Sequence, residues 1–162
     1  MSKFDPTDDA LIRRYADGVR LVDAALEGAT VEDLDRLPSD GWSARMVVHH
    51  LADSEAQSYV RVRRLLAEPN PTVIQGYDEA RWATTAVLGY QTEPIEGSLA
   101  VFRAVRDATS ALLTRISPAD LDRSGVHTES GHYSLRDWLR IYAAHGEDHA
   151  AQIAAARQGK SS

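Results

Sequence analysis

Four long stretches of this sequence repeat apolar residues at three- and four-residue steps, the spacing of one buried face of an α-helix. They cover about residues 6–26, 43–67, 94–116 and 134–153. Gly28 follows the first stretch, and Pro69 and Pro71 forbid continuation of the second. No segment carries a clear strand pattern, although residues 124–133 indicate a loop or a small hairpin. We therefore predict an all-α four-helix bundle, with longer loops after helices two and three.

Length and composition restrict the class of protein further. A chain of 162 residues fits a single domain, 1–162, large enough to fold without a disulfide or a metal. The net charge of −6 disfavours non-specific nucleic-acid binding. The absence of cysteine excludes disulfides, thiolate nucleophiles and cysteine-rich zinc sites. The N-terminus lacks the apolar core of a signal peptide, and no apolar run approaches the roughly 20 residues that span a membrane. We expect a cytoplasmic protein with neither nucleic-acid nor membrane partners.

Two histidines, His145 and His149, stand four residues apart in the last predicted helix. At 3.6 residues per turn they share one face, on the same stripe as Trp138 and Tyr142. This stripe points toward the bundle interior, where two neutral imidazoles need partners for their ring nitrogens. One metal ion can supply such a partner to both rings.

A third histidine, His50, lies in the second predicted helix, on the border between its apolar face and a polar strip. His49 points roughly 100° away from it, because each residue advances the helix by about that angle. His50 is therefore the better candidate for an inward-facing ligand. We predict a three-histidine metal site of His50, His145 and His149.

Three neutral imidazoles leave a divalent metal with open coordination positions, which is typical of catalytic rather than structural sites. A metal held in this way can activate water for attack on a substrate near neutral pH. Nitrogen donors suit zinc, nickel, copper or ferrous iron, and we expect zinc first and nickel next. One divalent metal per subunit is predicted.

Few other residues carry a chemical signal. Arg61 shares the His50 stripe and is a candidate for binding an anionic substrate group, whereas His127 and His132 are best interpreted as surface residues. Glu147 is expected to face water. No carboxylate near the histidines is singled out by spacing as a general base, so the side chains that act in catalysis stay unknown.

Four segments give the chain a family resemblance. They are WSARMVVHHLADSE, NPTVIQGYDEARWA, VHTESGHYSLRDWL and IYAAHGEDHAAQI. Together they resemble the DinB superfamily of four-helix-bundle metalloproteins, specifically its YfiT-like branch of metal-dependent hydrolases. The resemblance implies that His50, His145 and His149 bind one divalent metal, usually zinc or nickel, and that the protein is commonly a homodimer.

The resemblance leaves three functions open. The first is a metal-dependent hydrolase in which activated water attacks a small-molecule ester, amide or lactone. The second is a thiol S-transferase that uses bacillithiol, mycothiol or glutathione, because the chain has no cysteine of its own. The third is a non-catalytic metal-binding bundle. Family membership does not choose among them.

Overall fold

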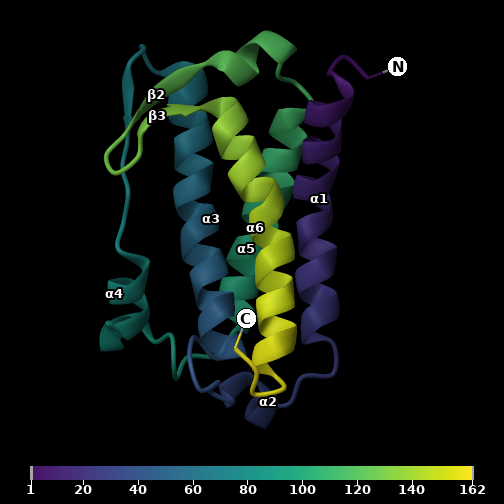
Figure 1. Cartoon of the computed structure of the whole chain (residues 1–162), viewed down its shortest axis with the longest axis vertical. Helices are drawn as coiled ribbons and strands as arrows, with labels where there is room; N and C mark the ends of the chain where they lie inside the picture. The colour runs from purple at the N-terminus through teal and green to yellow at the C-terminus, as the bar shows by residue number, and fades with distance from the viewer. Residues whose placement is uncertain (1, 162) are drawn as a thin grey trace.

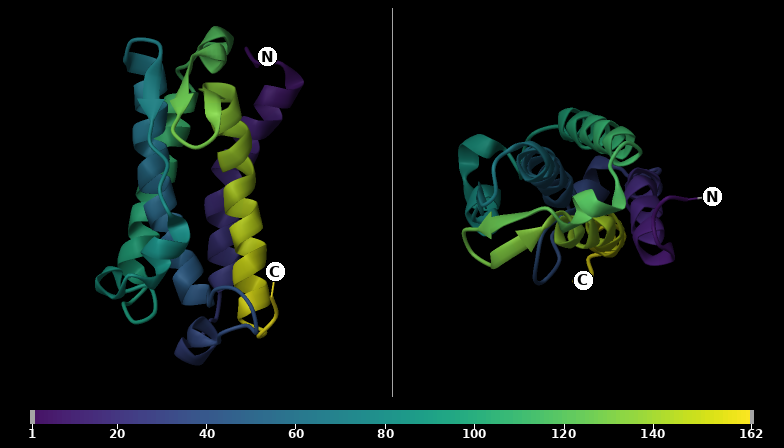
Figure 2. Two further views of the ribbon diagram at one scale, coloured as in Figure 1. Left: turned by 60° about the vertical axis from the view of Figure 1, so that its left-hand side comes forward. Right: turned by 90° about the horizontal axis from the view of Figure 1, so that it is seen from above.

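The computed structural model describes residues 2–161, and four long helices form its frame (Figure 1). They are α1 (Pro6–Leu26), α3 (Ala44–Ala67), α5 (Glu96–Leu113) and α6 (Leu135–Ala156). Helices α1 and α3 each pack against both α5 and α6, so they occupy opposite corners of the bundle (Figure 2). The predicted four-helix bundle is confirmed. Within the described residues, no helix is both long and apolar enough to cross a membrane.

Helix direction explains the long connection after α3. Helices α3 and α5 both run from the bottom of Figure 1 to the top, while α1 and α6 run from top to bottom. Two neighbouring helices that run in parallel need a connection that returns along the bundle. Residues 68–95 provide it and contain β1 (Thr72–Ile74), α4 (Glu79–Thr84) and a 3-10 turn, η1 (Ala86–Leu88). The chain between α1 and α3 holds only the short helix α2 (Val31–Asp35).

A small three-stranded sheet lies at one end of the bundle, and the sequence predicts it only in part. β2 (Ser124–His127) and β3 (Gly131–Ser134) form an antiparallel hairpin that follows η2 (Pro118–Asp122). This hairpin agrees with one of the two interpretations of residues 124–133. β1 pairs in parallel with β2, although its segment is predicted to be a loop. Three residues are too few for an alternating pattern, and the partner strand lies far along the chain.

Hydroxyl caps fix the starts of the two helices that carry the histidines. The Ser43 Oγ accepts a hydrogen bond from the Met46 N–H at 3.3 Å, at the start of α3. At the start of α6, Ser134 and Asp137 form a reciprocal capping box of 3.0 and 3.1 Å. These bonds satisfy N–H groups that have no partner within a helix. Helix α5 begins at Glu96 and ends at Leu113, within the predicted range.

The bundle interior consists of two apolar clusters separated by a polar layer. Each long helix contributes at least one residue to the cluster at the sheet end of the bundle and at least one to the cluster at the opposite end, with a buried glycine or charged residue between them. These triplets are Tyr15–Gly18–Val22 in α1, Val62–Glu55–Leu51 in α3, Leu113–Arg106–Phe102 in α5 and Ala143–Gly146–Ala150 in α6. The candidate histidines lie at the border of this layer: His145 directly precedes Gly146, while His50 and His149 directly precede Leu51 and Ala150.

Candidate metal centre

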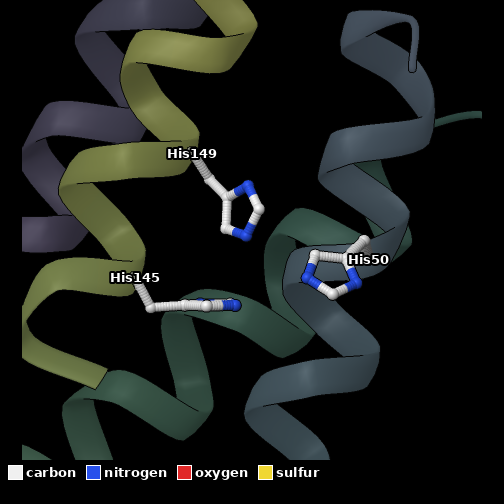
Figure 3. Close-up of side chains that lie close together, drawn as sticks. All are labelled: His50, His145 and His149. Carbon is white, nitrogen blue, oxygen red and sulfur yellow. The ribbon is translucent and has the colours of Figure 1, made fainter. Parts of the chain in front are cut away.

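His145 and His149 lie one turn apart on the side of α6 that faces α3 (Figure 3). Their ring centroids are 4.4 Å apart, and the two ring planes meet at 81°. The same stripe of α6 buries Trp138 and Tyr142, as the helical spacing predicts. The two histidines are therefore held by one rigid helix, on its inward face.

His50 approaches this pair from α3. Its ring centroid lies 4.8 Å from that of His149 and 5.4 Å from that of His145. One potential ligand atom from each of the three residues lies within 4.8 Å of the other two. Figure 3 shows the three rings turned toward one another in the space between α3 and α6. The structure thus brings together the three histidines that the sequence selects, and their binding of a metal stays a prediction.

Burial keeps all three imidazoles neutral. Loss of solvent, and then the nearby His149, lower the pKa of His50 to about 4. Burial likewise lowers the pKa of His145 well below its usual value and, less strongly, the pKa of His149. Neutral imidazole is the form that binds a metal, so these rings need no proton to be removed at neutral pH.

The hydrogen bonding of the rings fits a metal ion. The Nδ1 of His149 is 2.7 Å from the Gln152 Oε1, which leaves the Nε2 of His149 free to bind a metal through its lone pair. The Nδ1 atoms of His50 and His145 are buried, and no residue among 2–161 offers either atom a hydrogen bond. Such orphaned polar atoms are costly in a protein interior. Three neutral imidazoles on two helices form a donor set that suits a divalent transition metal.

His49 has a different environment, although it adjoins His50 in the sequence. Its Nδ1 lies 2.8 Å from the Ser98 Oγ, and its Nε2 lies 3.1 Å from the Glu93 carbonyl oxygen. Both ring nitrogens are therefore already paired, one with the first turn of α5 and the other with the segment before it. The choice of His50 over His49, made from helix geometry, agrees with the structure.

The other two histidines belong to the β2–β3 hairpin. His132 is exposed, while His127 is partly buried and packs against the Tyr133 ring with centroids 5.4 Å apart. The backbone N–H of Glu129 donates to the His127 Nδ1 at 3.3 Å. Neither histidine joins the three-histidine cluster.

Arg61 is linked to the histidine cluster through Tyr142 and Ser54. Its Nη1 donates to the Tyr142 hydroxyl at 3.2 Å, and its Nη2 donates to the Gln75 carbonyl oxygen at 2.9 Å. The Tyr142 hydroxyl also contacts Ser54, whose Oγ is 3.3 Å from the His145 Nε2. The Nε of Arg61 is buried and is left without a hydrogen bond by the described residues. A line of polar groups therefore leads from Arg61 to His145.

The carboxylates near the histidines separate into exposed and buried groups. Glu147 faces solvent, as predicted, and pairs with Arg14 at 2.6 Å, and Asp148 is also exposed. Asp53 accepts a hydrogen bond from the Tyr90 hydroxyl at 2.8 Å. Glu55 is the exception, because its side chain is completely buried.

Glu55 and Arg106 form a buried ion pair beside His145 that the sequence prediction missed. The Arg106 Nη2 is 2.6 Å from the Glu55 Oε1, and the Nε donates to the same oxygen at 2.8 Å. The Glu55 Oε1 also lies 3.9 Å from the His145 Nδ1. Burial raises the pKa of the Glu55 carboxyl, and the Arg106 guanidinium opposes that shift. The available signal was Arg106 itself, a charged residue in helical register with the apolar residues Phe102 and Leu113.

The fold and the histidine cluster define an all-helical bundle with a potential metal site, and comparison with known proteins supplies the family. The family model of the DinB superfamily matches residues 14–153. The chain belongs to the DinB superfamily, as its motifs predict.

Particular relatives narrow the comparison. The protein is 43% identical over 115 residues to a protein of Oceanobacillus iheyensis named "Putative metal-dependent hydrolase", a match that covers 71% of this chain and 64% of that one. A Bacillus mycoides protein of the same description is 36% identical over 134 residues, covering 79% and 75%. The chain thus spans just under two thirds of the first of these relatives.

A solved structure matches the whole fold. YfiT from Bacillus subtilis, described as "a probable metal-dependent hydrolase with an unusual four-helix bundle topology", superposes with a TM-score of 0.84 at 30% identity. The alignment covers 99% of this chain and 91% of YfiT. The YfiT-like branch suggested by the sequence motifs is therefore supported by structure as well.

Proposed function

We propose that this single-domain protein is a metal-dependent hydrolase whose metal is held by His50, His145 and His149. The observation that carries the proposal is the convergence of three neutral imidazoles from two helices, with one potential ligand atom of each within 4.8 Å of the other two. The names of the related proteins point to the same chemistry. When bound, a divalent metal with three neutral ligands polarises a carbonyl group and lowers the pKa of water.

The residues of the chain prepare this centre in two ways. Burial keeps the imidazoles unprotonated, and Gln152 holds the ring of His149 by its Nδ1. Such outer hydrogen bonds fix the orientation of a ligand ring and strengthen its binding. We propose zinc as the natural metal and nickel as the next choice, because the three donors are all imidazole nitrogens.

We further propose that Arg61 binds an anionic group of the substrate. Two of its nitrogens are held by Tyr142 and Gln75, so the guanidinium has a fixed position, and Arg61 lines a surface cleft together with Gln57 and Arg64. The line through Tyr142 and Ser54 connects it to His145. A carboxylate on the substrate would gain a charge-assisted hydrogen bond there.

Hydrolysis is tested with a panel of esters, amides and lactones presented to the zinc-loaded protein. We expect turnover of at least one class, loss of that turnover in His145→Ala, and retention of it in the control His49→Ala. Arg61→Met should raise KM for substrates with a carboxylate and leave KM unchanged for their neutral methyl esters. A silent panel, with one zinc per chain verified, would contradict the proposed hydrolysis.

The same preparation separates hydrolysis from thiol transfer. Incubation of the zinc-loaded protein with monochlorobimane and glutathione, bacillithiol or mycothiol reports S-conjugation directly. A metal-dependent conjugation rate combined with a silent hydrolysis panel would replace the hydrolase proposal with the transferase alternative. Silence in both assays would favour a non-catalytic metal-binding bundle.

We also propose that the protein is a homodimer and is located in the cytoplasm. The family resemblance supports the dimer, and the lack of cysteine in the sequence fits a reducing compartment. Analytical ultracentrifugation at micromolar concentration is expected to give twice the 17.8 kDa mass of the chain. A monomer under these conditions would contradict the dimer while leaving the metal site untouched.

A further inference from the structure

The buried Glu55–Arg106 pair needs an explanation beyond stability. Removing two charges from water is costly, and apolar residues of similar size often serve a protein core equally well. Here the Glu55 side chain is 0% exposed and that of Arg106 is 1% exposed. The bundle already has an apolar cluster on each side of this pair. Its deep burial therefore points to a role in the adjacent three-histidine site.

The guanidinium of Arg106 ties three other helices to this point. Besides Glu55 on α3, it donates to the Tyr15 carbonyl oxygen on α1 at 2.7 Å and to the Tyr142 carbonyl oxygen on α6 at 2.9 Å. The Tyr15 hydroxyl in turn contacts the second carboxylate oxygen, Glu55 Oε2, at 3.3 Å. Both Glu55 oxygens are therefore held in place by contacts from α1 and α5.

Two glycines make the space for this arrangement. A Cβ atom on Gly18 would lie 2.7 Å from the Arg106 Nη1, and a Cβ on Gly146 would lie 3.0 Å from the Gly18 Cα and 3.3 Å from the Arg106 Nη2. Helices α1 and α6 therefore cross closely at Gly18 and Gly146, and the guanidinium occupies the room beside them. Gly146 directly follows His145, so the crossing also fixes the backbone of that histidine.

The held carboxylate faces the outer nitrogen of a candidate ligand. The Glu55 Oε1 lies 3.9 Å from the His145 Nδ1, an atom that no other part of residues 2–161 pairs. A shift of about 1 Å would close this gap to hydrogen-bond length. A proton on the Nδ1 would leave the Nε2 of His145 as the unprotonated nitrogen, the form required for binding a metal.

We infer that Glu55, held by Arg106, is a positioning residue for the metal centre, where it accepts the Nδ1 proton of His145 and fixes both the tautomer and the orientation of that ring. The inference rests on the proposed metal site, and it assigns to Glu55 and Arg106 the role of orienting one of the ligands of that site. His149 has a neutral partner, Gln152, in the equivalent place. Of the two histidines on α6, one would therefore have a charged partner and the other a neutral partner at its Nδ1.

Zinc affinity and the tautomer of His145 test this role together. The key variant is Glu55→Met with Arg106→Met, because removing both charges avoids leaving either one buried and unpaired. A second variant, Glu55→Gln, keeps the shape of the side chain and removes only its charge. The control is Asp23→Asn with Arg103→Met, an ion pair of 2.7 Å that likewise joins α5 to a neighbouring helix, here α1, but whose side chains are 40% and 47% exposed.

We expect the Glu55→Met/Arg106→Met protein to remain folded and to bind zinc about 10- to 100-fold more weakly in a chelator competition. The control should bind zinc within about two-fold of the wild type, because a solvated ion pair that contacts none of the three histidines has little influence on them. Glu55→Gln should fall between them. A folded double variant with native zinc affinity would overturn the inference.

Nitrogen-15 NMR of the metal-free protein supplies a readout that does not depend on metal binding. We expect the wild-type His145 to carry its proton on Nδ1, and the double variant to lose that preference. If the wild type binds no zinc yet shows the Nδ1–H form, the proposed function fails and the positioning role of Glu55 stands. An Nε2–H form in the wild type would reject the positioning role.

Discussion

Replacing Gly18 with alanine perturbs the polar layer at its tightest point. The added methyl carbon would lie 2.7 Å from the Arg106 Nη1, well inside van der Waals contact. The end of an arginine side chain usually moves aside, but this one is held by Glu55, by the Tyr15 carbonyl and by the Tyr142 carbonyl. Relief of the clash therefore requires the loss of at least one buried hydrogen bond.

The expected cost follows from opposing contributions. Alanine is favoured over glycine in a helix by about 1 kcal/mol. Against this, overpacking costs about 1–3 kcal/mol, and losing a hydrogen bond from a charged donor costs about 1.5–3 kcal/mol. We expect Gly18→Ala to lower the free energy of unfolding by about 2–4 kcal/mol, which is roughly 4–16 °C in melting temperature for a chain of this size.

Gly97→Ala is the matched control, because it places the same methyl group in a helix at a point where nothing beyond the adjoining helix backbone lies within 4 Å. This variant should be neutral or gain up to about 1 kcal/mol. Urea denaturation followed by circular dichroism, in the presence of EDTA, measures both variants without a contribution from metal. Equal stabilities for Gly18→Ala and Gly97→Ala would refute the packing argument.

Three further predictions concern the site and its support. In the metal-free protein, the pKa of His50 lies near 4 rather than 6.5, because of burial and then of His149. Between pH 4 and pH 6.5 the unfolded chain binds more protons than the folded one, so the free energy of unfolding should fall by roughly 3 kcal/mol as the pH falls from 6.5 to 4. Urea denaturation across this range should show the fall, and His50→Ala should make it smaller. The same pH dependence in His50→Ala and the wild type would contradict the lowered pKa of His50. Gln152→Ala removes the 2.7 Å contact to the His149 Nδ1 and should weaken zinc binding about tenfold in chelator competition, so unchanged affinity would argue against the contact. Trp138→Phe removes the 2.9 Å hydrogen bond to the Ser58 Oγ and should cost about 2–3 kcal/mol by urea denaturation; a loss below about 0.5 kcal/mol would contradict its importance.

Helical periodicity was sufficient to predict the bundle and the inward face of the histidines. The spacing of His145 and His149 places both on the stripe of Trp138 and Tyr142, and the offset between His49 and His50 separates their environments. These features depend only on residues within one helix, whose geometry is fixed by local hydrogen bonds. The serine caps of α3 and α6 are local for the same reason.

Features that join distant segments were not predicted from the sequence. Strand β1 exists because Thr72–Ile74 pairs with residues more than fifty positions later, and three residues carry no periodic signal. The Glu55–Arg106 pair likewise depends on how α3 and α5 approach each other. A charged residue on an apolar stripe marks such a pair in the sequence, but the identity of its partner requires the arrangement of the helices.

The most direct test of the metal centre is a crystal structure of the zinc-loaded protein, with anomalous difference density measured at the zinc edge. We expect one zinc per chain, bound by nitrogens of His50, His145 and His149 at about 2.0–2.1 Å. The protein variants that lack any one of these histidines should bind zinc much more weakly, while His49→Ala should bind it normally. Density at another set of residues, or full zinc occupancy in the absence of His145, would contradict the proposal.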